Sequence, residues 1–456
     1  MKVSKIFQGD RVVWTIYFFL CIISLVEVFS AASTLSYRSG SFWSPLIKQA
    51  LFLGIGTLVV IAVHNIPCRF FKIIPLFFLP VCIFLLLVTS LFGGAVNGGA
   101  RWLSLGFIKF QPSELAKGVV ITAVALVLAK MQRAEGADKR AFKYILWITG
   151  IICALILTEN LSTAAILFGV VFLMMFIGRV PLLQLGKLLG VIFGVVLFAA
   201  IVVAVSPEDS AVFNLPGMHR ALTWKHRVSG HVGEASSDSN DFDMANNAQV
   251  GHARIAIASS NIVGKAPGNS VQRDFLSQAF SDFIFAIIVE EMGIEGAIFV
   301  VFLYVVLLIR SGRIASRCER NFPAFLAMGL ALLLVCQAAI NMMVATGLFP
   351  VTGQPLPLIS RGGTSTIITC VYIGMILSVS RYSIKTKEQN DPFAKGAQPL
   401  KRAAAATAHA RRQAAAPAAP AEDVEIENIP YHVEPDAPDE PLDDLVSAEA
   451  ASLAHK

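Results

Sequence analysis

The sequence predicts an all-α polytopic membrane protein with about ten transmembrane helices. Three observations favour this fold class. Hydrophobic residues make up 55% of the 456 residues and charged residues only 15%, whereas a soluble domain carries about 25% charged residues. The apolar runs approach the ~20 residues that cross a bilayer. Lys and Arg gather in short clusters between these runs, as they do in cytoplasmic loops.

About ten apolar segments have the length and composition of membrane spans. In chain order they are residues 12–33, 45–66, 73–92, 112–131, 144–157, 162–177, 183–205, 280–309, 323–346 and 364–380. The fifth and sixth segments are short and nearly continuous, so a single bent element is the alternative to two spans. That alternative would change the topology.

The basic residues predict the orientation of these spans. With both termini in the cytoplasm, the inner connections hold about a fourfold excess of Lys and Arg over the short outer connections. A nine-span arrangement would scatter the same clusters to both sides of the membrane. We therefore favour ten spans with cytoplasmic termini.

Three regions lie outside the spans. Residues 93–111 form a glycine-rich outer loop, and residues 206–279 form a large extracytoplasmic loop. Both belong to a membrane domain that covers residues 1–387. Residues 388–456 are rich in Ala and Pro and then acidic, so they have little apolar surface to bury. We expect this last segment to be a disordered cytoplasmic tail.

Charge and cysteine content exclude several classes of function. The formal net charge of +6 comes from loop clusters, and no basic domain with interleaved aromatic residues indicates nucleic-acid binding. None of the seven cysteines falls in a predicted outer loop, so no disulfide framework is expected. No CxxC or His-rich spacing indicates a zinc site.

The first polar group in the apolar field surrounds the start of the fourth span. Arg101 precedes this span, and Pro112 suits the first turn of a helix, where its missing N–H costs nothing. Glu114 follows in the first turn and Lys117 lies three residues on, so the two can pair on one face. The pair could simply hold the bundle together. The functional interpretation is a polar wall facing a phosphate-bearing substrate, with Arg101 and Lys117 as the cations.

The second polar group surrounds the start of the eighth span. Lys265, Asn269 and Ser270 lie in a Gly- and Pro-containing segment upstream of the span, and we interpret them as candidate substrate-binding residues. Asp282 lies at the outer end of the span, just before strongly apolar residues. A carboxylate partly withdrawn from water can act as a general base. A helix cap is the plainer role for it.

Two further carboxylates follow Asp282 along the same predicted helix. Helical geometry places Glu290 about 80° round the axis and ~12 Å deeper than Asp282. Glu290 is therefore a candidate substrate-binding residue. Glu291 would point the opposite way, so a structural role fits it better.

The third polar group is the connection 347–365, which is too rich in Pro and Gly to form a regular helix. Irregular backbone at membrane depth survives only where it is buried in protein or lines a wet cavity. Ser360, Gly362 and Gly363 lie at the start of the last span, where backbone N–H groups can bind an anion. An ordinary tight loop is the alternative.

Taken together, these groups resemble the shape, elongation, division and sporulation (SEDS) family, whose best-known members are FtsW and RodA. The resemblance covers residues 12–381. Its strongest motifs are Gly98-Gly-Ala-Arg-Trp with Gln111-Pro-Ser-Glu-Leu-Ala-Lys117, Asp282-Phe-Ile-Phe with Glu290-Glu-Met-Gly293, and the Pro350 to Gly363 run. Three separate motifs in the family's order make coincidence improbable.

The resemblance implies a ten-span peptidoglycan glycosyltransferase that polymerises lipid II, with inversion at the anomeric carbon. The family's catalytic aspartate corresponds to Asp282, and its Arg and Lys around the fourth span correspond to Arg101 and Lys117. The implied partners are a class B penicillin-binding transpeptidase and other division proteins at the bacterial inner membrane. Whether a divalent cation assists as a cofactor is left open.

The chain also departs from the family pattern. Ser281 stands where Thr is common, Leu276-Ser277-Gln278 replaces Leu-Pro-Glu, and Glu159-Asn160 replaces Pro-Asp. Arg361 stands where Tyr is often found. These departures concern the subfamily and the fine substrate contacts rather than the reaction. The Arg361-Gly-Gly-Thr form and the long tail favour the division branch, and hence a place at the septum.

Two other functions stay open. A lipid II flippase would also have about ten spans and intramembrane charges. Against it, the polar groups cluster on the predicted outer side rather than at the midplane, and no paired broken helices indicate an inverted repeat. The tail could also act as a scaffold that recruits division proteins, alongside an enzymatic membrane domain.

Overall fold

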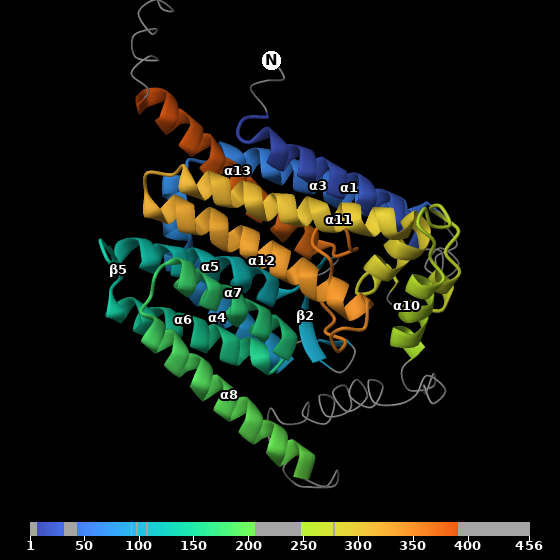
Figure 1. Ribbon diagram of the computed structural model, residues 1–456, viewed down its shortest axis with the longest axis horizontal. Helices are drawn as coiled ribbons and strands as arrows, with labels where there is room; N and C mark the ends of the chain where they lie inside the picture. Colours follow the sequence, from blue (N-terminus) through green and yellow to red (C-terminus); the bar gives the residue numbers. More distant parts are fainter. Residues whose placement is uncertain are drawn as a thin grey trace, which may run out of the picture. The chain divides into compact units, whose positions relative to one another are not determined.

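The computed structural model describes residues 7–31, 43–92, 94–96, 99–105, 108–205, 248–276 and 279–390. Within these residues, eight helices are long and apolar enough to cross a membrane (Figure 1). They are α1 (Arg11–Ala31), α3 (Ser44–Asn65), η2 (Cys68–Ile73) continued by α4 (Ile74–Phe92), α5 (Pro112–Lys130), α6 (Lys139–Leu157), α11 (Ile284–Ser316), α12 (Asn321–Ala345) and α13 (Thr364–Asn390). Two more apolar helices, α7 (Leu161–Ile177) and α8 (Leu182–Val205), correspond to the remaining predicted spans.

The fifth and sixth predicted spans are two separate helices, so the single bent element is wrong. Helix α6 ends at Leu157, and α7 begins at Leu161 and packs against it. Asn160 caps α7, because its side-chain oxygen accepts hydrogen bonds from the backbone N–H groups of Ser162 (3.1 Å) and Thr163 (3.4 Å). The polar turn at this cap is what separates the two apolar runs.

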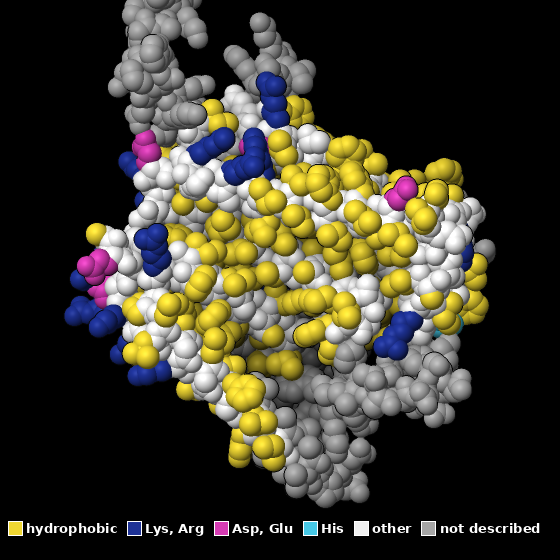
Figure 2. All heavy atoms as spheres, in the orientation of Figure 1, with side chains coloured by type: hydrophobic (Ala, Val, Ile, Leu, Met, Phe, Trp, Pro, Cys, Tyr) yellow, Lys and Arg dark blue, Asp and Glu magenta, His cyan; other side chains and the backbone are white. Residues whose placement is uncertain are grey.

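Burial separates central from peripheral helices. In the apolar windows of α5, α13 and α12, 78%, 72% and 61% of the residues are buried, against 22% in α3 and in η2–α4. The peripheral helices instead expose apolar side chains, which form a broad hydrophobic band in Figure 2. Such a band has no wet face and suits contact with lipid tails.

Charged side chains gather at one end of this band. Figure 2 shows Lys and Arg at the end of the bundle where Figure 1 places β5 and the connection between α11 and α12. Helix α11 begins beside Asp282 and ends at Ser316, so Asp282 lies at the other end of the bundle. We call the end where Lys and Arg gather the opposite end, and the end that holds Asp282 the Asp282 end.

Short strands occupy two of the connections. The glycine-rich loop before α5 contains the antiparallel strands β1 (Gly94–Val96), β2 (Gly99–Leu105) and β3 (Ile108–Phe110), in the order β1-β2-β3. Strand β2 packs against α4 and α5. At the opposite end, β4 (Gln132–Arg133) and β5 (Gly136–Ala137) form a hairpin between α5 and α6. The sequence predicted neither set of strands.

The eighth predicted span is interrupted. Helix α11 begins only at Ile284, and Gly293 within it has φ 70° and ψ −170°, which breaks the helical path. A Cβ at this position would lie 2.1 Å from the Ile262 carbonyl oxygen, so only glycine fits. The segment that follows α10 (Ala248–Ala258) lies in the break. Backbone hydrogen bonds join the two sides: Lys265 N to Glu290 O, Ala266 N to Glu291 O, Ile294 N to Asn261 O and Glu295 N to Ile262 O.

The remaining predicted regions lie partly or wholly outside the described residues. Of the large loop 206–279, the structure describes residues 248–276 and 279. Of the predicted tail 388–456, it describes only the last turn of α13. The predictions for the rest of these segments stay predictions.

Candidate functional site

Asp282 lies in a turn that leads into α11. The turn covers residues 279–283, and the Asp282 side chain is half-buried. The Ser281 hydroxyl donates a hydrogen bond to Asp282 Oδ1 at 3.0 Å. The carboxylate therefore sits at the mouth of a helix whose first turns are buried and apolar.

The irregular connection between α12 and α13 holds the main chain on both sides of Asp282. Ser360 Oγ donates to the Ser281 carbonyl oxygen (2.6 Å), and the Arg361 N–H donates to the Phe280 carbonyl oxygen (3.0 Å). From α12, Asn341 Nδ2 donates to the Asp282 carbonyl oxygen at 2.9 Å. The carbonyl groups of three consecutive residues thus accept hydrogen bonds from neighbouring elements. These bonds fix the main chain at Asp282 and thereby position its side chain.

This connection is buried backbone without regular structure, as the sequence predicted. Leu356, Leu358 and Ile359 are buried, and Leu358 has a left-handed φ of 66°, a strained conformation for a branched side chain. Buried carbonyl groups need donors. Side chains of the surrounding helices supply them: Asn341 to Gln354 O, Gln337 to Pro355 O, Tyr304 to Pro357 O and Ser24 to Ile359 O.

Ser360, Gly362 and Gly363 lie beside this turn, but they differ in what they offer a ligand. Ser360 is buried, and its hydroxyl is occupied by the Ser281 carbonyl and the Leu356 N–H. It is therefore a positioning residue in this structure. Gly362 caps α13, because its carbonyl accepts from the Ser365 N–H and hydroxyl at 3.1 and 2.9 Å. Gly363 has a left-handed φ of 54°.

Arg361 contacts this turn through Phe280, because its N–H donates to the Phe280 carbonyl oxygen. Its guanidinium lies 5.5 Å from the centroid of the Phe280 ring, a cation–π distance. Partial burial lowers the pKa of Arg361 from its ordinary value, but a guanidinium stays protonated in proteins. A positive charge is thus retained against Phe280, two residues before Asp282 in the same turn.

Glu114 and Lys117 pair as their spacing predicted. Lys117 Nζ lies 2.9 Å from Glu114 Oε1, and the side chains are 0% and 4% exposed. Lys117 also donates to Gln337 Oε1 at 2.8 Å, and Gln337 donates in turn to the Pro355 carbonyl. The pair is therefore joined to the irregular connection through Gln337. Arg101 belongs to β2, and its side chain lies outside the described residues.

Lys265, Ser270 and Glu290 come together in a second polar cluster. Glu290 is fully buried, and its carboxylate binds Lys265 Nζ (2.7 Å), the Ser270 hydroxyl and the Val271 N–H (3.2 Å). Asn269 closes the exposed turn by donating to the Lys265 carbonyl at 2.9 Å. The cluster ties the segment after α10 to the break in α11.

Glu291 joins the same segment, so its predicted opposite orientation is wrong. Its Oε1 accepts from the Ser270 N–H at 3.3 Å and from the Ser30 hydroxyl of α1. The segment wraps round the broken helix end and meets both carboxylates. The role is structural, as expected, because it links α1 to α11.

Sequence reasoning missed Glu27. It is fully buried in α1, and neither carboxylate oxygen has a hydrogen-bond partner among the described residues. It interacts electrostatically with Glu291. The available signal was a lone acid inside an apolar span, which is rare and often functional.

A cavity of about 460 Å³ adjoins this cluster. Its walls come from α1, α3 and the segment after α10, and they are mostly apolar, including Leu25, Phe29 and Leu46. Arg273 lines it, and the Arg273 guanidinium also donates to the Ser30 hydroxyl at 3.2 Å. The cavity offers an elongated apolar group a place beside one cation.

Within the described residues, no group of three or more His, Cys, Asp or Glu side chains could hold a metal ion. The structure therefore assigns no set of metal ligands.

Comparisons with known proteins agree on one group. Residues 10–385 match the family model described as cell cycle protein, which covers FtsW, RodA and SpoVE. The chain is 32% identical to the probable peptidoglycan glycosyltransferase FtsW of Legionella pneumophila, over 79% of this chain and 88% of the relative. It is 30% identical to the protein of the same name from Coxiella burnetii, over 79% and 93%.

Solved structures resemble the chain over most of its length. One comes from work on the structural coordination of polymerization and crosslinking by a peptidoglycan synthase complex. It has a TM-score of 0.62 and 25% identity, over 82% of this chain and 98% of that one. The rod shape determining protein RodA of Thermus thermophilus has a TM-score of 0.56 and 23% identity, over 82% and 97%. The second likeness concerns the fold.

Proposed function

Because the chain belongs to the family of the cell cycle proteins FtsW, RodA and SpoVE, we propose that it is a peptidoglycan glycosyltransferase that polymerises lipid II into glycan strands, with Asp282 as the general base. One observation carries the assignment of the base. Asp282 is a half-buried carboxylate whose backbone is held by Asn341, Ser360 and the Arg361 N–H. A catalytic base needs such a fixed position relative to the hydroxyl it deprotonates.

The reaction is a single displacement at the anomeric carbon of the donor sugar. The hydroxyl of an acceptor lipid II attacks that carbon while its proton passes to Asp282. The bond from the carbon to the pyrophosphate oxygen breaks, and the pyrophosphate leaves with its bonding electrons. Attack opposite to the leaving group inverts the anomeric configuration.

The leaving pyrophosphate needs positive charge where negative charge grows. We assign this role to Arg101 and Lys117. Lys117 is buried against Glu114 and Gln337, so it acts through its field and through the connection that Gln337 holds. Arg101, on β2, would supply the direct contact.

The remaining candidate residues surround the path of the substrate. Lys265, Asn269, Ser270 and Glu290 fix the segment that borders the cavity of about 460 Å³. Its apolar walls suit a polyprenyl chain, and Arg273 suits a phosphate at the end of that chain. Gly362 and Gly363 leave backbone near the Asp282 turn open to close approach.

Orientation and partners follow from the same premise. The gathering of Lys and Arg at the opposite end supports an inner-membrane orientation with both termini cytoplasmic and Asp282 on the outer side. The likeness to a structure of a peptidoglycan synthase complex supports a class B penicillin-binding transpeptidase as partner. Relatives named FtsW favour the septum and other division proteins. The tail, residues 388–456, is the candidate recruiter.

The test is glycan-strand formation from labelled lipid II by the purified full chain together with its transpeptidase. Asp282→Asn keeps the size of the side chain and removes the base, so polymerisation is expected to fall at least about 100-fold. Asp138→Asn, which replaces a half-buried acid at the opposite end, is the matched control. A wild-type rate in Asp282→Asn would end the general-base assignment.

A translocation assay separates the flippase alternative. In lipid vesicles, Asp282→Asn should change lipid II movement across the bilayer no more than Asp138→Asn does. Selective loss of translocation, with polymerisation intact, would instead favour transport.

A further inference from the structure

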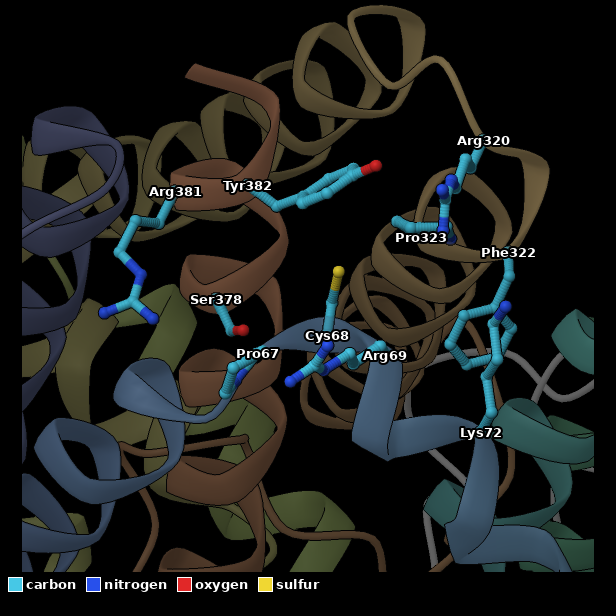
Figure 3. Close-up of a pocket in the computed structure, with 10 residues that line it drawn as sticks. All are labelled: Pro67, Cys68, Arg69, Lys72, Arg320, Phe322, Pro323, Ser378, Arg381 and Tyr382. Atoms are coloured by element: carbon cyan, nitrogen blue, oxygen red, sulfur yellow. The ribbon is translucent and has the colours of Figure 1, made fainter. Parts of the chain in front are cut away.

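A basic pocket lies at the opposite end of the bundle, far from Asp282. The cavity measures about 350 Å³ and is open to the outside. Figure 3 shows that its walls come from η2, from the start of α12 and from the end of α13. These elements are separated in sequence, so the fold itself assembles the cavity.

Four cations line this pocket and give it its name: Arg69, Lys72, Arg320 and Arg381. No lining residue is Asp or Glu, and Glu319 next to Arg320 is not among the lining residues. Within the described residues, none of the four cations forms an ion pair with a carboxylate. Like charges held together without a counter-charge repel one another, so the pocket is complete only with an anion.

The cations are held in place by contacts that leave their charge available. Arg381 donates to the side-chain and backbone oxygens of Asn65 at 3.0 and 2.8 Å. The Lys72 ammonium lies 5.6 Å from the centroid of the Phe322 ring. Lys72, Arg320 and Arg381 are also close enough to act electrostatically on the buried Cys68, which lines the same pocket. None of these neighbours carries a negative charge.

A helix end adds to the same field. Helix α12 begins at Asn321 with Arg320 as its N-cap, and no side chain caps it. The N–H groups of the first turn and the helix dipole both favour an anion at this end. The dipole therefore reinforces the four side chains rather than opposing them.

The setting indicates which anion. The pocket lies where spans end among clusters of Lys and Arg, which is the depth of lipid headgroups. Directly next to it, Phe70 and Ile73 are 47% and 46% exposed, and Leu76 and Phe77 of α4 are 73% and 64% exposed. A lipid whose phosphate enters the pocket can lay its acyl chains along this apolar surface.

We propose that the basic pocket binds the phosphate of an anionic phospholipid headgroup in the cytoplasmic leaflet. Bound there, the lipid joins η2, the start of α12 and the end of α13. At the other end of the bundle, Asn341 of α12 and Ser360, just before α13, hold the turn of Asp282. The site is separate from the proposed glycosyltransferase site, and its test does not depend on that activity.

The proposal is tested by native mass spectrometry of the full chain, which measures how well it retains phosphatidylglycerol and phosphatidylcholine. The wild type should retain phosphatidylglycerol selectively. Each Lys or Arg near an anionic headgroup contributes about a fivefold gain in affinity, so Arg69→Gln with Arg320→Gln should weaken retention about thirtyfold. The control, Lys139→Gln with Lys143→Gln, removes the same charge from exposed positions at the same end.

Three outcomes would overturn the proposal. Equal loss in the control pair would mean diffuse attraction rather than a site. Equal retention of phosphatidylcholine would remove the role of the phosphate charge. Inorganic phosphate that binds alone and displaces the lipid at equal concentration would make this a site for free phosphate.

Two single variants guard against loss of folding. Arg69→Gln alone removes an exposed charge that lies over the Phe70 ring, and it should still weaken retention about fivefold. Arg320→Lys keeps the positive charge that Arg320→Gln removes, so it should retain most of the phosphatidylglycerol binding. If the double variant does not fold, the two single variants still test the proposal. Unchanged retention of phosphatidylglycerol in Arg69→Gln would count against the pocket.

Discussion

The two ends of the helix bundle treat their cations in opposite ways. At the Asp282 end, Lys117 pairs with Glu114 and Lys265 pairs with Glu290, with both carboxylates buried. In the basic pocket, four cations meet without a carboxylate partner among the described residues. Removing one member of a buried ion pair leaves the other charge uncompensated and destabilises the protein. Removing a cation at an open cavity should change the stability of the protein little.

The difference indicates two uses of charge. The Asp282 end satisfies its polar groups internally, so that a catalytic turn keeps one geometry before the substrate arrives. The basic pocket keeps its charge for a ligand. The same contrast predicts which substitutions unfold the protein and which ones change only binding.

Removing Lys117 is expected to have the largest effect. Lys117→Met leaves Glu114 as an uncompensated charge in the protein interior, which typically costs about 3–5 kcal/mol. Thermal unfolding in detergent should show this loss. Arg320→Gln removes a cation of the basic pocket that pairs with no carboxylate among the described residues, so it should change the unfolding temperature little.

A double variant sharpens this test. Lys117→Met with Glu114→Gln removes both charges and should recover most of the lost stability, but not polymerisation. If Arg320→Gln destabilised the protein as strongly as Lys117→Met, the contrast between the two ends would be wrong.

Gly293→Ala is expected to have the next largest effect on stability. Its φ of 70° with ψ −170° is open almost only to glycine, and the strain alone costs about 1–3 kcal/mol. The new Cβ would also lie 2.1 Å from the Ile262 carbonyl oxygen, so the segment after α10 must move. Hydrogen exchange should report faster exchange at Lys265 and Ala266.

Gly194→Ala is the matched control. A Cβ at Gly194 in α8 meets nothing within 4 Å, and Ala favours a helix by about 1 kcal/mol over Gly. This variant should be neutral or slightly more stable. Equal destabilisation by the two substitutions would show that the break in α11 is not specific to Gly293.

Sequence alone predicted the features that local physics decides. Helix positions followed from apolar runs of membrane length, and the Glu114–Lys117 pair followed from a spacing of three residues on one helix. The contacts between distant segments could not be predicted in this way. Lys117 meets Gln337, 220 residues away, and the conformation of Gly293 depends on a segment that precedes α11. Local pattern specifies neither pairing.

The carboxylates illustrate the same limit. Glu290 and Glu291 were separated by helical geometry, yet the segment at Ser270 binds both of them. Glu27 carries no motif, so only the packing of α1 against α11 reveals its place beside Glu291. Motifs located the Asp282 end, but its hydrogen-bond network emerged from the tertiary fold.

Asn341→Ala should have a smaller effect on stability and a selective effect on activity. It removes two donors, to the Asp282 and Gln354 carbonyl oxygens, and buried unsatisfied carbonyls cost about 1–3 kcal/mol. Because the Asp282 turn loses an anchor, polymerisation should fall about tenfold or more, while lipid II binding changes less.

Thr346→Ala provides the comparison on the same helix. Among the described residues, the Thr346 hydroxyl bonds to carbonyls of α12 itself, at Met342 and Met343. Its removal should leave the polymerisation rate unchanged. A rate in Asn341→Ala equal to that of Thr346→Ala would mean that the Asp282 backbone needs no support from α12.

The smallest effect is expected at Asp138, the half-buried N-cap of α6 at the opposite end. The Arg140 N–H donates to its carboxylate at 2.8 Å and, with nearby Arg133, lowers the pKa of Asp138 below its ordinary value of 3.8. A lowered folded-state pKa gives stability that is present above the unfolded value and is lost as the pH falls through the folded value. Asp138→Asn keeps a capping oxygen, so it should change stability at pH 7 little and flatten the loss of stability below about pH 4.

High salt should weaken the Arg133–Asp138 ion pair at the surface, as the substitution does. The buried Lys117–Glu114 pair should be insensitive to salt. Equal salt sensitivity at the two pairs would contradict the contrast between an internally satisfied end and an open one.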